Sequence, residues 1–296
     1  MEFIESISRG ENPSDFYKEV KEIQTGTTKD EIIKGIIEGA EQTKEKYKYH
    51  GTSEETLSMA CGSYLTSAII NLNLNALEDP KKDEKLHNDV ANVVKIIKEI
   101  HSHSNCSWEE IKNGFFAEAS VAVSLKIMGF EIYLPDPIDD TRGKTDLIAY
   151  DRKEKIILPI QVKSSSNLKG VVLDEITESN QKTILQHIVS NWDDKTQSMD
   201  SEKIGHAGEK LESLKTSLTE SFGKMLEYLK PILSSKEYKV CPILIAIPGG
   251  DSCENSMFNT LTGAPIGKRQ PYDEKNSLSG IIYGKLERII YPEGEE

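Results

Sequence analysis

The sequence lacks an apolar run long enough to cross a membrane, and it lacks a secretory start. A membrane-spanning helix needs about 20 consecutive apolar residues. The first residues, Met1 to Glu5, show neither the basic start nor the apolar run of a signal peptide. We therefore expect a cytoplasmic protein with no membrane partner.

Cysteine is scarce, and its four occurrences show no paired spacing. They are Cys61, Cys106, Cys241 and Cys253. This pattern favours reduced structural thiols over disulfides. His101, His103 and Cys106 could be drawn as half of a zinc site, but no second pair of ligands lies nearby. We interpret residues 101–106 as a polar linker.

Positive charge is also in short supply. The chain has 36 Lys and Arg against 49 Asp and Glu, a formal net charge of −13 at pH 7. Because basic side chains dominate nonspecific nucleic-acid binding, this balance argues against broad attraction to DNA or RNA. A local basic cluster can still act within a screening length of about 8 Å. The candidates for such a cluster are Arg142, Lys144, Lys169, Lys268 and Arg269, the last two beside Gln270 and Tyr272.

A length of 296 residues leaves room for two domains or one large one. The 37% hydrophobic and 29% charged content is typical of a soluble globular protein. Amphipathic stretches predict helices over residues 29–47, 54–74 and 85–100, and none of them carries a catalytic motif. We predict a helical domain over residues 1–105, for partner choice, dimerisation or target selection, and a second domain over residues 106–296.

One apolar stripe predicts a helix that begins after Ser107. Ser107 and Glu110 have the spacing of a capping box, and Gly129 supplies a left-handed stop. Glu118 falls inside this stripe. A buried carboxylate needs a cation, a hydrogen-bond donor or a shifted pKa. A metal site would satisfy Glu118, and so would a core lysine or an interface.

Alternating patterns after this helix predict three strands. The first covers residues 130–134, and a loop leads to a second strand over residues 145–150. A polar turn over residues 151–154 precedes a returning strand over residues 155–163. Folding the last two strands about Arg152 and Lys153 would bring Asp146 opposite Pro159 or Ile160.

The returning strand gathers chemically useful side chains. A bulge at Pro159, which cannot donate to the ladder, would bring Gln161 level with Asp146. Gln161 and Lys163 would share one face, with Val162 pointing into the core. Together with Glu118 they form a set of two carboxylates, an amide and an amine, which could hold a divalent metal and activate a water. Such a set of groups is typical of a metal-dependent phosphodiesterase.

Four ordered segments of the chain resemble the PD-(D/E)xK, or restriction-endonuclease-like, nuclease superfamily. They are residues 116–119, 129–133, 143–148 and 160–165. The sequence is most similar to members with glutamine in the acidic position (QxK), as in some homing and transposition nucleases, and lies near the archaeal Holliday-junction resolvases. The resemblance implies a restriction-endonuclease-like α/β core, with a mixed central sheet flanked by helices, after the all-α N-terminal region.

The resemblance also implies roles for individual residues. Asp146 matches the central metal-binding aspartate, Gln161 and Lys163 match the E/QxK element, and Glu118 matches the helix glutamate. Mg²⁺ or Mn²⁺ would bind these oxygens, and the backbone carbonyl of Val162 would complete the shell. The metal would lower the pKa of a bound water, and Lys163 would orient that water or stabilise charge on the phosphate.

Glutamine in the acidic position removes one negative charge, so metal binding relies more on Glu118. Asp139 and Asp140 are spare ligands in the preceding loop, or solvated loop residues. Ser164 and Ser165 could hydrogen-bond phosphate oxygens, or could simply form a loop.

The later chain completes the sheet. An apolar stripe predicts a helix over residues 211–229 that stops at Pro231, and the apolar run of residues 240–247 predicts a strand covered on both faces. The segment from residue 174 to residue 208 is polar and irregular in pattern.

The function we predict is a Mg²⁺- or Mn²⁺-dependent endonuclease, with DNA favoured over RNA by the resemblance. Arg142, Lys144, Ser164 and Ser165 are the expected nucleic-acid contacts. Two alternatives stay open: a degenerate nuclease fold that binds nucleic acid or protein, and an RNA-cleaving effector or toxin. A homodimer, and a protein partner bound by the helical region, are compatible with the sequence.

Overall fold

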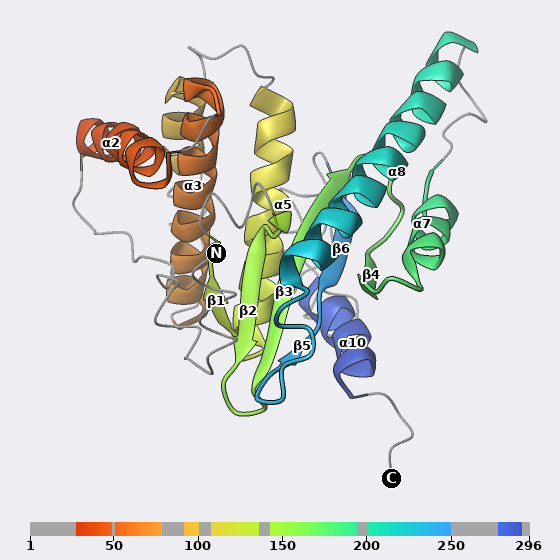
Figure 1. Ribbon diagram of the computed structural model, residues 1–296. Coiled ribbons are helices and arrows are strands. Elements are labelled where there is room, and N and C mark those ends of the chain that lie inside the picture. The colour runs from red at the N-terminus through yellow and green to blue at the C-terminus, as the bar shows by residue number, and fades with distance from the viewer. Residues whose placement is uncertain are drawn as a thin grey trace.

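A computed structural model describes residues 28–48, 51–78, 92–100, 108–135, 143–193, 201–249 and 278–291. Within these residues the protein is an α/β structure, with a mixed six-stranded open sheet flanked by helices (Figure 1). This confirms the α/β prediction at that level. In the described part of the chain, no helix has both the length and the apolar character that a membrane crossing requires.

The sheet is built around β3, its longest strand. The strands are β1 (Glu131–Tyr133), β2 (Leu147–Asp151), β3 (Ile156–Ser165), β4 (Val172–Glu175), β5 (Lys239–Val240) and β6 (Ile243–Pro248). Their order is β1-β2-β3-β6-β4, and β5 pairs with β3. The first three strands form an antiparallel meander, β6 runs parallel to β3, and β4 is antiparallel to β6. The three strands predicted around Asp146 are all present, with shifted ends.

Two prolines face each other where the sheet is interrupted. Ile157 pairs with Val240 and Ile160 pairs with Ile243, so Pro159 lies level with Pro242. The predicted apolar strand of residues 240–247 is thus split into β5 and β6 at Cys241 and Pro242. Neither proline has an N–H to donate, which explains the break in pairing between these strands.

Helix α5 (Trp108–Ile127) ends at a left-handed glycine, as the sequence predicts. Gly129 has φ +96°, its N–H donates to the carbonyl of Lys126, and the Phe130 N–H donates to the carbonyl of Leu125. This is the hydrogen-bond pattern of a Schellman cap, in which a residue other than glycine would be strained. The chain therefore leaves α5 in a fixed direction and enters β1. The predicted N-cap, Ser107, lies outside the described residues.

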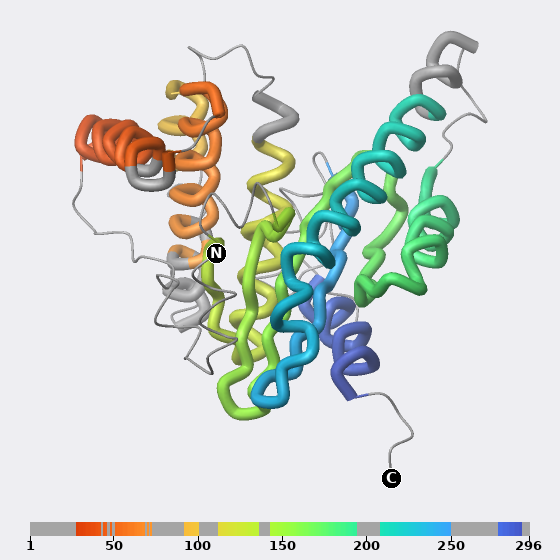
Figure 2. The backbone as a smooth tube through the Cα atoms, in the orientation of Figure 1, coloured from red at the N-terminus to blue at the C-terminus, as the bar shows by residue number. Residues whose placement is uncertain are grey.

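Each face of the sheet has its own apolar cluster. Helices α5 and α10 (Leu278–Ile290) cover the face that carries Leu158, Ile160 and Val162. Helices α7 (Gln181–Ser190) and α8 (Ser201–Leu229) cover the opposite face, which carries Ile148 and Ile157. Figure 2 traces α10, near the C-terminal end, back to the sheet, where it contacts β4 and α5.

The N-terminal helices form a further layer on α5. Helix α2 (Lys29–Tyr47) has the predicted bounds, and α3 (Ser53–Glu78) contains the second predicted helix. Residues 92–100 form a third helical segment. Their buried residues join α5 and the sheet in one continuous apolar cluster. The predicted domain boundary at residue 105 lies outside the described residues and stays a prediction.

The segment predicted as irregular, residues 174–208, contains regular structure. It holds the end of β4, all of α7, and the start of α8. Helix α7 has only two fully buried residues, Ile184 and Ile188. A stripe of two apolar positions is too short to stand out in a polar sequence, which explains the error.

The structure describes two of the four cysteines. Cys61 and Cys241 are buried free thiols, as predicted, and burial raises their pKa to about 12 and about 11. Several other predicted features fall outside the described residues. They are the 101–106 linker, Asp139, Asp140, Arg142, Cys253, Lys268, Arg269, Gln270 and Tyr272.

Candidate active site

Asp146 lies beside β3 at the end of the β2–β3 ladder. The ladder ends with the pair of Leu147 and Ile160, and the Asp146 N–H donates to the Ile160 carbonyl at 2.8 Å, which places Asp146 beside the part of β3 that carries Gln161. The predicted bulge at Pro159 is wrong, because pairing is unbroken from Asp151–Ile156 to Leu147–Ile160. Asp146 thus lies beside the predicted part of β3, but in a different register.

The register differs because the connecting turn lies one residue later in the chain than predicted. It occupies residues 152–155, and Lys155 adopts a left-handed conformation with φ +53°. The Asp151 carboxylate accepts hydrogen bonds from the N–H groups of Lys153 and Glu154, at 2.9 and 3.0 Å. These bonds hold the turn and move the centre of the hairpin by one residue. Each pairing therefore moves by two residues relative to a turn centred on Arg152 and Lys153, and the strands pair past Pro159 without a bulge.

The Asp146 carboxylate binds the backbone of β3. Its Oδ2 accepts a 2.6 Å hydrogen bond from the Val162 N–H. Strand β2 begins at Leu147, so this side chain takes the place of a further β2 backbone carbonyl. The N–H and C=O of a strand residue point to the same side, which directs the Val162 carbonyl toward the same gap beside Asp146. This orientation agrees with the ligand role predicted for the Val162 carbonyl.

Burial raises the pKa of the Asp146 carboxyl above its usual value. Three neighbours act in the opposite direction: the ammonium of Lys163, the Val162 N–H and the ammonium of Lys144, in that order. Although Asp146 as a residue is partly exposed, its carboxyl group is surrounded by protein. Loss of water is therefore the largest influence on its charge.

Gln161 is almost completely buried, with a relative exposure of 1%. Its Oε1 atom has no hydrogen-bond partner in the part of the chain that the structure describes. By strand alternation, Gln161 and Lys163 project from the same face as Ile157, the face that α8 covers. A buried amide oxygen without a donor costs about 1–3 kcal/mol, so a cation or a donor is needed to satisfy it.

Lys144 is held in place by the segment around it. It adopts a left-handed conformation, φ +51°, between Gly143 and Thr145, which are both buried. Gly143 packs against the Tyr228 ring of α8, and a Cβ atom at Gly143 would lie 2.6 Å from that ring. The glycine thus allows α8 to approach the segment that leads into Asp146.

Glu118 lies on α5, on the other side of the sheet from Gln161. It is partly exposed between buried Ala117 and Ala119. In the first half of α5, the backbone carbonyl of Asn113 accepts a hydrogen bond from Ser164 Oγ of β3 at 3.4 Å. Glu118 follows Asn113 by five residues, so helical geometry places it about 7.5 Å further along the axis, level with Val162 of β3. Its side chain is rotated about the helix axis by about 140° relative to that of Asn113. The ligand role of Glu118 stays a prediction.

Asn113 is a residue that the sequence analysis missed. Its Oδ1 atom is buried and has no hydrogen-bond partner among the described residues. It lies across β3 from Gln161, beside Ser164. The signal in the sequence was an asparagine, a weak helix former, within an apolar helical stretch.

The two serines after Lys163 take part in local hydrogen bonds. Ser164 contacts α5 as described, and Ser165 Oγ accepts from the Asn167 N–H at 3.2 Å. The Gly249 N–H donates to the Ser165 carbonyl at 2.8 Å, which ties this turn to the end of β6. Lys169, from the predicted basic cluster, lies 3.7 Å from Asp193. The loop interpretation is wrong for Ser164 and Ser165, because both belong to β3 and pair with Ile247 and Pro248 of β6. Their substrate contacts stay predictions.

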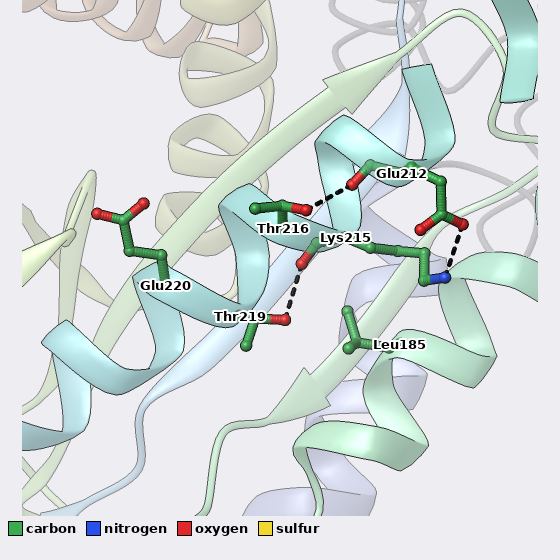
Figure 3. Close-up of a pocket in the computed structure, with 6 residues that line it drawn as sticks. All are labelled: Leu185, Glu212, Lys215, Thr216, Thr219 and Glu220. Carbon is green, nitrogen blue, oxygen red and sulfur yellow. Dashed lines mark hydrogen bonds and ion pairs between the residues drawn. The ribbon is translucent and has the colours of Figure 1, made fainter. Parts of the chain in front are cut away.

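A hollow with a volume of about 470 Å³ lies between α7 and α8 (Figure 3). It is lined by Leu185, Glu212, Lys215, Thr216, Thr219 and Glu220. Lys215 pairs with Glu212 at 2.8 Å, and both threonine hydroxyls bind carbonyls of their own helix. Its polar groups are largely satisfied within α8, so we do not assign it a ligand.

Among the described residues, no group of three or more His, Cys, Asp and Glu side chains could hold a metal ion. A metal at Asp146 would instead rely on amide and carbonyl oxygens. The unpartnered Oε1 of Gln161 fits that requirement, since hard cations accept neutral oxygen ligands. Comparisons of the chain with family models, with curated proteins and with solved structures found no match.

Proposed function

We propose that this protein is a Mg²⁺- or Mn²⁺-dependent nuclease that hydrolyses phosphodiester bonds. The observation that carries the proposal is the buried, unpartnered Oε1 of Gln161, next to the buried carboxyl of Asp146. The Gln161 oxygen has no donor among the described residues, and the Asp146 carboxyl has lost its contact with water, so both favour a positive charge nearby. A divalent cation meets that need, and phosphate hydrolysis is the chemistry that such a cation serves best.

The proposed metal ligands are Asp146, Gln161 and the Val162 carbonyl, with Glu118 as a further candidate from α5. Asp146 would bind with the oxygen that the Val162 N–H leaves free. When bound, the metal supplies an acidified water and neutralises charge on the phosphate. Gln161 and Val162 lie on β3, and Asp146 is hydrogen-bonded to the same strand, so little reorganisation of these three is required.

Lys163 is the proposed catalytic amine. It projects from the same face as Gln161, and its charge lowers the pKa of the Asp146 carboxyl more than that of Lys144 does. From there it would orient the attacking water or stabilise the negative charge that develops on the phosphate. DNA is the proposed substrate, on the basis of the resemblance to QxK-type PD-(D/E)xK nucleases.

Calorimetric titration with Mn²⁺, followed by a cleavage assay, tests the proposal. The cleavage panel contains supercoiled, linear, single-stranded and branched DNA beside RNA. Absence of Mn²⁺ binding, or binding unchanged in Asp146→Ala, would remove the catalytic assignment. Metal binding without cleavage of any substrate would indicate a binding module, and cleavage of RNA alone would indicate an RNA-cleaving effector.

A further inference from the structure

The segment that leads into Asp146 rests against one side chain of α8. Gly143 packs on the ring of Tyr228, and a Cβ atom at Gly143 would lie 2.6, 3.0 and 3.2 Å from the Cδ1, Cε1 and Cγ atoms of that ring. Real Cβ atoms essentially never come within 3.0 Å of another heavy atom, so a side chain at position 143 would require the ring or the segment to move. The lack of a Cβ atom therefore makes this close contact possible.

The Tyr228 ring has a fixed position because α8 is anchored to the sheet. Met225 and Leu229, on either side of Tyr228 in the helix, have exposures of 0% and 1%. Both belong to the apolar cluster between α8 and the sheet, and Tyr228 packs against that cluster. Moving the ring away from Gly143 would displace these buried side chains. The contact between Tyr228 and Gly143 is therefore set by the core of the protein.

The backbone between this contact and Asp146 is held in an unfavourable conformation. Lys144 is left-handed, with φ +51°, which is strained for a residue other than glycine. Thr145, which is 2% exposed, donates a hydrogen bond from Oγ1 to the Gly143 carbonyl at 3.3 Å. Strained conformations persist only where the surrounding structure imposes them. The contact of Gly143 with Tyr228 supplies such a constraint from outside the segment.

Asp146 is connected to two parts of the structure. It lies immediately before β2, which begins at Leu147. Toward β3, its N–H donates to the Ile160 carbonyl at 2.8 Å, and its Oδ2 accepts from the Val162 N–H at 2.6 Å. Toward the N-terminus, it continues the segment that rests on Tyr228. The place of its carboxylate therefore depends on both the strand and the ring.

Resting on the proposed nuclease function, we propose that Tyr228 is a positioning residue for the Asp146 carboxylate. Its ring holds residues 143–146 in the strained path that keeps Oδ2 on the Val162 N–H and leaves Oδ1 to act at the site. Without the ring, Lys144 can return to an ordinary backbone conformation, and the carboxylate moves off the Val162 N–H. The contact with the segment is made by ring carbons, so the hydroxyl of Tyr228 is not required.

Hydrogen exchange of two neighbouring amides, measured by NMR in EDTA, tests the proposal without any metal. The Val162 N–H donates to Asp146, whereas strand alternation directs the Lys163 N–H to the other side, toward β6. The measured quantity is the ratio of the Val162 exchange rate to the Lys163 exchange rate. In Tyr228→Ala this ratio should rise at least about 10-fold, because a hydrogen bond to a carboxylate is lost. Tyr228→Phe should keep the wild-type ratio.

Gly143→Ala disturbs the same contact from the other side and should also raise the ratio. Gly223→Ala is the matched control, because a Cβ atom at Gly223 of α8 would meet no described residue outside its own helix within 4 Å, and it should keep the wild-type ratio. A ratio unchanged in Tyr228→Ala overturns the proposal. Equal acceleration of both amides also overturns it, because that result shows only a general loss of stability. A ratio raised as much in Tyr228→Phe as in Tyr228→Ala overturns the role of the ring.

Cleavage kinetics separate this proposal from the proposed function. Tyr228→Ala should lower kcat by about 10²-fold with little change in KM, since a small displacement of a catalytic group has an effect of this size. A wild-type protein that cleaves no nucleic acid overturns the proposed function, whereas the exchange ratio still decides whether Tyr228 holds Asp146. The two failures are therefore distinguishable.

Discussion

The carboxylate of Asp146 accepts a 2.6 Å hydrogen bond from the backbone N–H of Val162, sixteen residues later in the chain. A side chain thus continues the β2–β3 ladder where the backbone of β2 no longer does. This bond keeps a desolvated carboxylate in place at the end of the paired strands. It also links the stability of the protein to the chemistry proposed for the site.

Asp146→Asn should stabilise the metal-free protein at neutral pH. The folded-state pKa of Asp146 is raised, chiefly by burial, so its stabilising contribution is complete below the unfolded-state pKa and is lost as the pH rises through the folded-state pKa. Asparagine keeps an oxygen for the Val162 N–H and carries no charge. The melting temperature of the variant, relative to that of the wild type, should therefore increase between pH 4 and pH 7.

Differential scanning calorimetry in EDTA measures this difference. Asp174→Asn is a suitable control, because Asp174 is bound to His187 at 3.0 Å and has a different environment. A variant at position 146 that is less stable than the wild type at pH 7 would show that the charge of Asp146 is favourable in the fold.

Metal affinity should fall as the pH is lowered. The metal needs the ionised carboxylate, and a raised pKa means that protons compete at a higher pH than they do at an ordinary aspartate. Calorimetric titration with Mn²⁺ between pH 5 and pH 8 should show affinity that rises with pH and release of protons on binding. An affinity independent of pH over this range would exclude Asp146 as the ligand.

Gln161→Met should be tolerated by the fold although Gln161 is 1% exposed. It replaces an unpartnered buried oxygen with an apolar group of similar size, which removes a cost of about 1–3 kcal/mol. Urea denaturation should show equal or greater stability, and Mn²⁺ binding should be lost. Gln161→Glu should retain or tighten Mn²⁺ binding, because it adds a charged ligand.

Asn180→Leu provides the contrast for this prediction. The Asn180 amide accepts from the Thr177 N–H at 2.9 Å and donates to the Glu175 carbonyl at 2.7 Å. Its loss should cost about 1–3 kcal/mol. If Gln161→Met destabilises the protein as much as this variant does, the Gln161 amide has a structural partner that the proposal overlooks.

Lys163→Ala should abolish cleavage while metal and substrate still bind together. The amine is assigned to the water or the phosphate and not to the metal, so a loss of about 10²–10³-fold in rate is expected. Single-turnover cleavage and calorimetry measure the two properties separately. Lys169→Ala, which removes an exposed lysine paired with Asp193, is the control. Near-normal cleavage by Lys163→Ala would refute the role assigned to Lys163.

Lys155→Gly should stabilise the β2–β3 hairpin. Lys155 has φ +53°, and glycine adopts this conformation without strain, for a net gain of about 0.5–1 kcal/mol. The gain is reduced by the loss of an exposed ion pair with Glu237 at 3.5 Å. Lys153→Gly, at a position of the same turn without positive φ, should lower stability in the same denaturation experiment.

Much of the architecture around the site could be predicted from local patterns. The helix that ends at Gly129 and the three strands after it follow from apolar periodicity and turn residues. The register could not be predicted, because it depends on the left-handed backbone conformation of Lys155. A glycine in a sequence often indicates a positive φ, whereas a lysine does not. An error of two residues kept the side chains on the correct faces, since the strand repeat is two.

The arrangement of the candidate site was harder to predict than its members. The sequence shows that Glu118 lies in an apolar stripe, but not which face of the sheet its helix covers. That choice is made by packing between α5, α3 and the sheet. The sequence likewise could not show that the side-chain oxygens of Asn113 and Gln161 lack hydrogen-bond partners, because this depends on which groups surround them in three dimensions.

The position of α5 between the sheet and α3 has a consequence for the stability of the molecule. This helix is buried on one side by strands and on the other by α3, so removal of the N-terminal layer would open the outer side of α5 to water. Strand β3, which carries Gln161 and Lys163, is thus stabilised partly by residues more than fifty positions earlier in the chain. Helices α2 and α3 are therefore also one wall of the half of the molecule that carries the candidate site.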